Sequence, residues 1–562
     1  MSTESKILEE RSDYLEKDQI QNWFVTNKYF KRIQKKLIGT GAKLLIGPRG
    51  TGKTHHMLMT HHQCLGDASK PVSLYITFNK YFKLEPLISK ATNAKSIFHT
   101  WVLSNILLSI YEFCQEQNIE TELLINDNFL NRNNLVEFNS KAESGFFRFE
   151  NHDIPSILSV SKVKAVIEKL ITSTGRKRAI ILFDDAALTL TPDYLIELFE
   201  IFTSLKSKSI SPKASVYPGT TNYGPKFHPG HDAEEVECWI NVSDNMQSYS
   251  DFMNEIINKR LSQLITDIDD NVIELLKFAS FGIPRAFLFL LRSYTQSDKS
   301  TRQSKYNEVL DIHATLLQNE YLSLKKKMPQ FSNIIETGFS FFSNLISEVV
   351  ELNKSKKTGK TLTVGIEPST NAMINRMIQF LNEAGLIYKH TSGVSHGAGR
   401  DYDRYTPHLL FLLKDRAFST NRGFDTSSIL NKLKSKESKQ PLRRKFETIL
   451  NPEDINGLVL NLPPCSNCNT VRIQEDQIFC HICGTKLIMF SAFEECMKIP
   501  ITEVPLTPVQ RRAIEESPFV LIGDIYSSKS PASELRKSDQ IGHVRSSDIL
   551  VKINNLVNEF LA

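Results

Sequence analysis

An eight-residue segment near the start of the chain carries the residue types that bind polyphosphates. Residues 47–54 fit the pattern G-x-x-x-x-G-K-[ST] and follow the apolar run 44–46. Glycines let backbone N–H groups approach phosphate oxygens, and the lysine and threonine of the motif suit the β- and γ-phosphates and Mg²⁺. A glycine-rich turn with a chance lysine is the alternative, but the position between a strand and a helix favours a nucleoside-triphosphate site. The predicted nucleotide-binding residues are Gly47, Pro48, Arg49, Gly50, Thr51, Gly52, Lys53 and Thr54.

Two carboxylates follow a second apolar run. Residues 178–183 lead directly into Asp184 and Asp185. We expect this strand to lie beside the strand of the phosphate loop in a parallel sheet, where Asp184 orders the Mg²⁺ shell and Asp185 polarises the attacking water. The predicted Mg²⁺ ligands are therefore Thr54 and Asp184, and the predicted catalytic residues include Lys53, Asp184 and Asp185. Aspartate reaches less far than the glutamate usual at the second position, so we expect slow hydrolysis.

Four cysteines have the spacing of a zinc site. Two C-x₂-C pairs are separated by eleven residues, which brings four thiolates around one tetrahedral Zn²⁺. Disulfides are the alternative, and a reducing cytosol disfavours them. The predicted zinc ligands are Cys465, Cys468, Cys480 and Cys483. The scattered Cys64, Cys114 and Cys238 are expected to be buried thiols.

Further elements are needed to position these residues. Residues 71–78 and 214–217 have the composition of strands, while the polar region 120–155 is expected to be a long insertion or loop. After residue 217, a side chain among Thr220, Thr221 and Asn222 would contact the γ-phosphate, or the segment is a polar loop. Arg285 follows a glycine turn at the start of a helix, from which a guanidinium can reach back to the phosphates from a helical lid.

The order of these elements resembles the AAA+ ATPases of the origin-recognition and replication-initiator clade and their relatives, the STAND NTPases. The resemblance covers about residues 15–300 and rests on the phosphate loop, the Asp-Asp strand and the G-x-P-R turn at 282–285. It implies that Arg285 is the sensor-2 arginine of the lid and that residues 250–260 form the helix before it. The sequence contains no convincing intersubunit arginine finger, so a ring is not predicted, although a homo-oligomer stays open.

A winged helix is expected after the lid. Apolar helices at 332–354 and 368–385 precede a strand at 386–388, a polar loop at 392–404 and a strand at 405–413. Replication-initiator ATPases carry such a module, which contacts either DNA or protein. Arg400 and Arg404 are the predicted phosphate contacts, supported by Lys389 and His390.

The C-terminal part holds two more candidate contact regions. The basic segment 427–447 is either a solvated linker or a path for a phosphate backbone. The last sixty residues resemble a helix-hairpin-helix domain, in which Gly542, His543 and Arg545 would bind a DNA phosphate at a helix N-terminus. A small helical protein-docking domain is the alternative.

The predicted fold class is α/β, with a parallel P-loop (AAA+) sheet and helical lid followed by a winged helix, a zinc ribbon and a small all-α domain. The expected boundaries are 1–245 for the ATPase core, 246–325 for the lid, 326–425 for the winged helix, 426–455 for a basic linker, 456–498 for the zinc ribbon and 499–562 for the helix-hairpin-helix.

Composition sets the remaining expectations. A net charge of +5 over 562 residues does not by itself indicate nucleic acid, and the sequence has no apolar run of the ~20 residues that a membrane span needs. The polar N-terminus is not a secretory signal, so we expect a cytoplasmic protein. The expected function is an ATP-dependent switch that binds nucleic acid, most simply DNA, and controls a separate effector protein, in antiphage defence or a mobile element. The alternative is an ATP-binding scaffold with slow or no turnover.

Overall fold

The structure is a computed structural model of the whole chain. It describes residues 15–25, 27–78, 84, 87, 93–125, 128–143, 154–186, 192–219, 221, 223–242, 246–261, 265, 267–355, 359–390, 394–395, 401–419, 424–437, 442–470, 472, 477–487, 492–528 and 530–561.

A five-stranded parallel sheet forms the N-terminal core. Its strands are β1 (Lys43–Ile46), β2 (Val72–Thr77), β3 (Ala179–Asp184), β4 (Ile210–Val216) and β5 (Glu234–Glu237), in the order β2-β3-β4-β1-β5. All four pairings are parallel, so the carboxyl ends of the strands meet at one edge. One expectation was wrong: β3 does not lie beside β1, because the later strand β4 is inserted between them.

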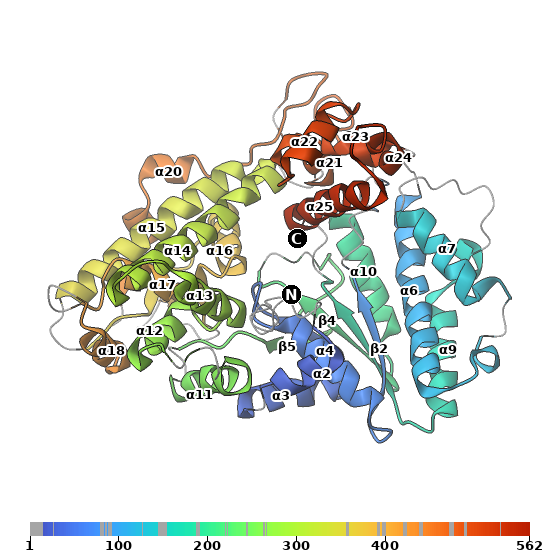
Figure 1. Cartoon of the computed structure of the whole chain (residues 1–562), viewed down its shortest axis with the longest axis horizontal. Helices are drawn as coiled ribbons and strands as arrows, with labels where there is room; N and C mark the ends of the chain where they lie inside the picture. Colours follow the sequence, from blue (N-terminus) through green and yellow to red (C-terminus); the bar gives the residue numbers. More distant parts are fainter. Residues whose placement is uncertain are drawn as a thin grey trace.

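Helices cover both faces of this sheet (Figure 1). On one face α3 (Lys28–Ile38) and α4 (Lys53–Leu65) share a buried cluster with β1, β3 and β5. On the other lie α6 (Ala94–Gln117), α9 (Val160–Ser173) and α10 (Pro192–Leu205). The region expected to be a long loop contains α7 (Arg132–Glu143), whose buried Leu135 and Phe138 hold it against α6. Polar composition concealed this narrow apolar stripe.

Helix α6 has the length and apolarity of a membrane span, but 72% of its most apolar window is buried inside the protein. It is the helix that packs on β2, α7 and α10.

The lid is a group of helices after the sheet. Helix α11 (Met246–Ile256) runs into the π-helical turn η6 (Ile257–Leu261), and α12 (Asp270–Ala279), α13 (Pro284–Gln296) and α14 (Arg302–Lys327) follow. Gly282 joins α12 to α13 at a φ of +78°, and a Cβ there would lie 2.0 Å from the Ile240 carbonyl oxygen. Only glycine therefore fits this junction between lid and core.

The winged helix follows the lid directly. It consists of α15 (Ser332–Ser355), β6 (Val364–Ile366), α16 (Ala372–Glu383), β7 (Ile387–Lys389), β8 (Val394–Ser395), β9 (Asp401–Pro407) and α17 (Leu409–Lys414). The last strand was expected to reach residue 413, but it ends at Pro407. His408 caps α17 by accepting a hydrogen bond at Nδ1 from Leu410 N at 3.2 Å, and the apolar run after it is buried as a helix.

The basic segment 426–455 is not a linker. It folds into α18 (Thr426–Lys434), β10 (Leu442–Arg444), α19 (Phe446–Ile449) and α20 (Pro452–Asn456). Strand β10 pairs in parallel with β6 and so extends the winged-helix sheet, while Leu433 and Phe446 enter its core. The lysines of this segment favoured the prediction of a solvent-exposed linker. Lys432 is instead buried and donates to the Asn353 carbonyl at 2.6 Å.

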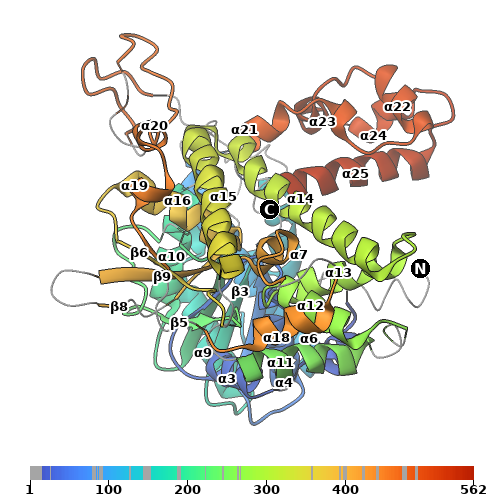
Figure 2. The same cartoon turned by 90° about the vertical axis from the view of Figure 1, so that its left-hand side faces the viewer.

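The C-terminal part begins with the cysteine-rich segment. It continues with four short helices and ends with one long helix. These are α21 (Ala492–Met497), α22 (Pro508–Glu515), α23 (Ile522–Ser527), α24 (Pro531–Leu535) and α25 (His543–Leu561), drawn in red in Figures 1 and 2. Helix α21 packs on α14, and the Lys326 ammonium lies 4.0 Å from the Glu503 carboxylate. The C-terminal helices therefore rest on the far end of the lid.

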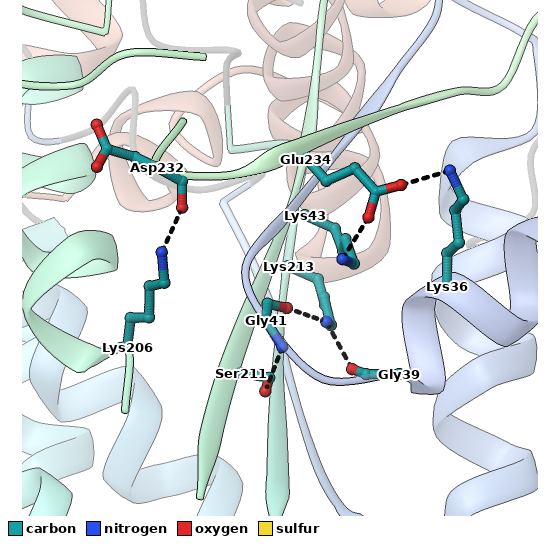
Figure 3. Close-up of polar contacts among 9 residues, drawn as sticks. All are labelled: Lys36, Gly39, Gly41, Lys43, Lys206, Ser211, Lys213, Asp232 and Glu234. Carbon is teal, nitrogen blue, oxygen red and sulfur yellow. Dashed lines mark hydrogen bonds and ion pairs between the residues drawn. The ribbon is translucent and has the colours of Figure 1, made fainter. Parts of the chain in front are cut away.

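A buried lysine fastens the amino end of the central sheet (Figure 3). Lys213 on β4 donates to the carbonyls of Gly39, at 2.8 Å, and Gly41, while Ser211 accepts from Gly41 N at 3.1 Å. Beside it Glu234 binds the ammonium groups of Lys36 and Lys43, each at 2.5 Å. These contacts fix the turn that delivers the chain into β1 and the phosphate loop.

Candidate nucleotide site

The phosphate loop connects β1 to α4 in the conformation that its glycines allow. Gly50 and Gly52 have φ values of +84° and +91°, which side-chain-bearing residues rarely adopt. The Thr51 hydroxyl closes the loop by donating to the Pro48 carbonyl at 2.9 Å. The N-terminus of α4 therefore faces the hollow of the loop, where its N–H groups can meet an anion.

Lys53 lies in this hollow. Its Nζ donates to the carbonyls of Gly47 at 2.6 Å and Pro48 at 3.1 Å and sits 4.4 Å from the centre of the Tyr217 ring. Burial lowers the pKa of Lys53 to about 8, against the attraction of Asp185 and Asp184. The ammonium is thus held at the loop by two neutral carbonyl oxygens and an aromatic ring, which anionic phosphate oxygens can replace.

Asp184 is fixed by four donors at the end of β3. Its carboxylate accepts from Tyr75 Oη at 2.8 Å, from Ser215 Oγ at 2.9 Å and from the Asp185 N–H at 3.1 Å. The Thr54 hydroxyl also hydrogen bonds to it. Burial raises the pKa of Asp184, and these hydrogen bonds oppose the rise. The two predicted Mg²⁺ ligands are therefore brought together.

Asp185 follows in a left-handed conformation, with φ at 53°. Its N–H donates to Ser215 Oγ at 2.8 Å, so one serine on β4 holds both members of the Asp-Asp pair. Asp185 also lies in the electrostatic range of Lys53 and Tyr217. This is the position from which a carboxylate can act on a water beside the phosphates.

Arg285 reaches the loop from the lid. The Arg285 N–H donates to the Gly50 carbonyl at 3.3 Å, and a Cβ placed on Gly50 would lie 2.9 Å from the Arg285 Cβ. The structure thus brings Arg285 to the phosphate loop, where the sequence placed it.

The expected contact after β4 is only partly described. Thr220 and Asn222 lie outside the described residues, and the Thr221 hydroxyl donates back to the Tyr217 carbonyl at 3.1 Å. The strand end that faces Lys53 is instead occupied by Tyr217, whose buried phenol has its pKa raised by desolvation.

The residues present fit a nucleotide and Mg²⁺. The positive-φ glycines leave the cradle free of Cβ atoms, a lysine lies in the hollow, and the Thr54 hydroxyl hydrogen bonds to the buried Asp184 carboxylate. When bound, Mg²⁺ would be held by Thr54 and Asp184 and would neutralise developing charge on the phosphates.

The four predicted zinc ligands also converge. The Sγ atoms of Cys465 and Cys483 are 3.4 Å apart, as are those of Cys468 and Cys480, and all four lie within 4.8 Å of one another. Zn–S bonds of about 2.3 Å require tetrahedral S···S edges of roughly 3.8 Å. The donor set therefore fits a structural Zn²⁺.

The predicted nucleic-acid contacts lie on two different parts of the chain, the winged helix and the start of α25. Arg400 lies outside the described residues, and Arg404 is a mid-strand residue of β9 paired with Gly365. His543 accepts from Arg536 at 2.7 Å, and Arg545 donates to the Gln540 carbonyl at 2.7 Å beside the exposed Gly542. His390, a supporting candidate, is buried on Thr406. Arg404 thus lies on the winged-helix sheet, whereas Gly542, His543 and Arg545 lie at the start of α25.

Three site residues were not predicted from the sequence. Ser215 and Tyr75 lie on strands that also carry Ser211, Lys213 and Ser73, so neither stands out as a lone polar residue, although both side chains donate to Asp184. Glu383 has a different origin, because it comes from α16 of the winged helix and lies in the electrostatic range of Lys53 and Arg49. No local pattern indicates a contact between parts of the chain so far apart.

The N-terminal part of the chain matches a known family. Residues 8–212 fit the family model described as ORC-CDC6-like. The matched residues include β1, β2 and β3, with the phosphate loop and the Asp-Asp pair, and end at the third residue of β4. No curated protein matches the chain.

Several solved structures share weak similarity with it. A Walker-type ATPase of Pyrococcus abyssi is 13% identical, with a TM-score of 0.40, over 73% of this chain and 99% of that one. The Aeropyrum pernix ORC1 protein in complex with DNA is 14% identical, with a TM-score of 0.32, over 73% and 95%. The Aeropyrum pernix ORC2 protein, in ADPNP–ADP complexes, is 10% identical, with a TM-score of 0.31, over 73% and 97%.

Proposed function

We propose that this chain is an ATP-dependent switch, an ATPase whose nucleotide state is passed to a DNA-binding winged helix. The observation that carries the proposal is the meeting of Lys53, Thr54 and Asp184 at the carboxyl edge of the sheet, with Arg285 of the lid against the same loop. Positioning and charge neutralisation of this kind are what phosphoryl transfer requires.

The proposed chemistry assigns one task to each residue. Lys53 neutralises charge at the β- and γ-phosphates, Thr54 and Asp184 hold Mg²⁺, and Asp185 orients the water that attacks the γ-phosphate. Arg285 links the nucleotide to the lid. Because Asp185 is short for its task, turnover is expected to be slow.

The decisive test is steady-state ATP hydrolysis by the full-length protein, with and without double-stranded DNA, at low and moderate salt. DNA stimulation that fades with salt supports the switch, since phosphate contacts are lost as salt rises. The variant Lys53→Ala should abolish hydrolysis, whereas Lys141→Ala, an exposed lysine paired with Glu137, should leave it unchanged. Full activity in Lys53→Ala would refute the proposed site.

A protein-binding scaffold is the second candidate, and two observations favour it. The basic groups of Lys389, Arg444 and Lys445 are paired with the carboxylates of Asp403, Glu348 and Glu367 at 3.1, 2.6 and 3.4 Å. The cysteine cluster carries exposed apolar side chains at Ile478, Phe479 and Ile482. A slow ATPase rate that DNA does not change, at any salt concentration, would select this candidate.

The cytoplasmic setting and a role in antiphage defence or a mobile element rest only on the resemblance of the module order. The test is phage plating on bacteria that express the wild-type chain or Lys53→Ala. Protection by the wild-type chain alone would support defence, and equal plating on both would argue against it.

A further inference from the structure

The carboxyl end of α16 closes over the nucleotide site. Gly385, just after the helix, is so near the phosphate loop that a Cβ on it would lie 3.6 Å from Pro48 Cβ and 3.4 Å from Ile283 Cδ1 of the lid. Six residues earlier, Gln379 packs on the turn after β4, where a Cβ on Gly219 would meet Gln379 Cγ at 3.2 Å. The winged helix thus touches the phosphate loop, the lid and the turn after β4 together.

Aromatic contacts hold the winged helix in this position. The rings of Trp239, after β5, and Tyr388, on β7, meet edge to face at 4.9 Å. On the other side of the junction, Phe281 of the lid lies 4.6 Å from the ring of His408. All four side chains are buried, so the docked arrangement is a packed interface.

Glu383 is the acidic residue at this end of α16. Its side chain is half-buried, and the charged groups that act on it are Arg376 of α16, Lys53 and Arg49 of the phosphate loop, and Lys327 of α14. Burial raises the pKa of Glu383 to about 7. An acid of the winged helix therefore shares the charge cluster of the phosphate loop.

Tyr217 connects the two sides of this cluster. The Lys53 Nζ lies 4.4 Å from the centre of the Tyr217 ring. The charged groups that act on the Tyr217 phenol are Arg49, Asp185, Glu383 and Arg285. Glu383 is therefore near the end of the site that Lys53 and Asp185 define, where a γ-phosphate is expected.

From this arrangement we infer that Glu383 is a specificity-determining residue, which weakens triphosphate binding relative to diphosphate binding while the winged helix is docked. A carboxylate at this end opposes each added negative charge, and the triphosphate carries one more than the diphosphate at the nearer end. Since Glu383 also shares Lys53 and Arg49 with the ligand, its loss frees these cations for the phosphates. The inference rests on the proposed nucleotide site.

The test compares the affinities of full-length wild type and Glu383→Gln for ADP and for the non-hydrolysable analogue AMPPNP, both with Mg²⁺, by isothermal titration calorimetry. Glutamine keeps the shape of the side chain and removes its charge. We expect the preference for AMPPNP over ADP to rise about tenfold, with ADP affinity changing less. Glu453→Gln, an exposed acid on α20, is the control and should leave both affinities unchanged.

A reciprocal variant keeps the inference testable if Glu383→Gln fails to fold. Gln379→Glu places a second carboxylate one turn away and should lower AMPPNP affinity more than ADP affinity. An unchanged AMPPNP-to-ADP ratio in either folded variant, or a fall in the ratio for Glu383→Gln, overturns the inference. Failure of the nucleotide site itself is distinguishable, because wild type would then bind neither nucleotide.

Discussion

At the scale of single residues, the site depends on how β4 supports the Asp-Asp pair. Ser215 donates to the Asp184 carboxylate and accepts from the Asp185 N–H, so one hydroxyl sets the direction of both acids. In this arrangement the Asp185 backbone is left-handed, a conformation that non-glycine residues adopt only where neighbours enforce it. The serine is thus a positioning residue rather than a catalytic one.

Replacing Ser215 with alanine should lower kcat for ATP hydrolysis about tenfold with a small effect on KM. A hydrogen bond to a charged group is worth about 1.5–3 kcal/mol, and its loss lets both acids drift from their working geometry. Steady-state kinetics measure this change.

The matched control is Ser211→Ala on the same strand. Ser211 is also buried and holds one hydrogen bond, from Gly41 N, but at the opposite end of β4. It should lose comparable stability and keep its kcat. An equal fall of kcat in both variants would show that stability, and not the position of the acids, limits turnover.

The residues of the site differ in how far sequence could predict them. Lys53, Thr54 and Asp184 follow from motif and strand context, and the structure brings them together. Ser215 and Glu383 do not follow, because a hydroxyl among several polar residues of a strand and an acid at the end of a helix have many ordinary roles. Only the tertiary packing gives them a shared target.

At the scale of elements, helix α4 combines the phosphate loop with four histidines. His56 stacks on Phe30 at 4.4 Å, and His61 lies 3.1 Å from the Ser73 hydroxyl. Burial lowers the pKa of His55 to about 4 and of His61 to about 3, and lowers those of His56 and His62 as well. The helix is therefore built from imidazoles in the neutral form.

Acid should destabilise the domain of the five-stranded sheet through this helix. A histidine whose pKa is lower in the folded state binds fewer protons there, so stability is complete above about pH 6.5 and falls as the pH drops toward 4. His61→Asn should reduce the slope by up to about 1.4 kcal/mol per pH unit. Urea midpoints of both proteins across this range give the measurement, and parallel curves would contradict the assignment.

The turn between α12 and α13 depends on a glycine. Gly282→Ala should destabilise the protein by roughly 2–5 kcal/mol, because a left-handed backbone and a clash with the Ile240 carbonyl act together. Thermal unfolding measures the loss, together with weaker nucleotide binding, since Arg285 would shift.

Gly230→Ala separates the two causes. Gly230 has a similar φ of +87° but open space around it, so its replacement should cost only about 1–2 kcal/mol. Equal destabilisation by the two alanines would mean that the clash at Gly282 is relieved by movement of the lid.

Elements were predicted best where apolar periodicity was strong. The phosphate-loop strand, α15 and α16 lie close to their predicted positions. The 426–455 segment was misjudged because its lysines concealed the buried Leu430 and Leu433 of α18 and Leu442 of β10, the strand that extends the sheet begun at β6. Pairing between distant strands has no local signature.

At the scale of the whole molecule, the cysteine-rich segment stands apart from the rest. Its buried cluster holds Cys465, Cys480 and Leu487, whereas the C-terminal helices share one continuous core with β2, β3 and α6. Just before the first cysteine pair, the chain is attached to the end of the lid, because Asn461 N donates to the Gln330 carbonyl at 2.8 Å.

Removing zinc should therefore unfold only the segment around the cysteines. Cys465→Ser, or a chelator, should abolish zinc content and expose residues 463–487 to hydrogen exchange, while ATP hydrolysis and the main thermal transition stay unchanged. Loss of protection in β1 or α4 would show that the ribbon supports the ATPase core.

The late strand β10 has a consequence for how each new molecule is made. A chain leaves the ribosome from its N-terminus, and domains fold as they emerge. The five-stranded sheet is complete once Glu237 is out, but the winged-helix sheet needs Leu442 to pair with Val364. In a nascent chain the phosphate loop is therefore accessible to cellular nucleotide before the winged helix is complete and α16 can pack against the loop. The first nucleotide bound in the life of the protein is chosen without Glu383.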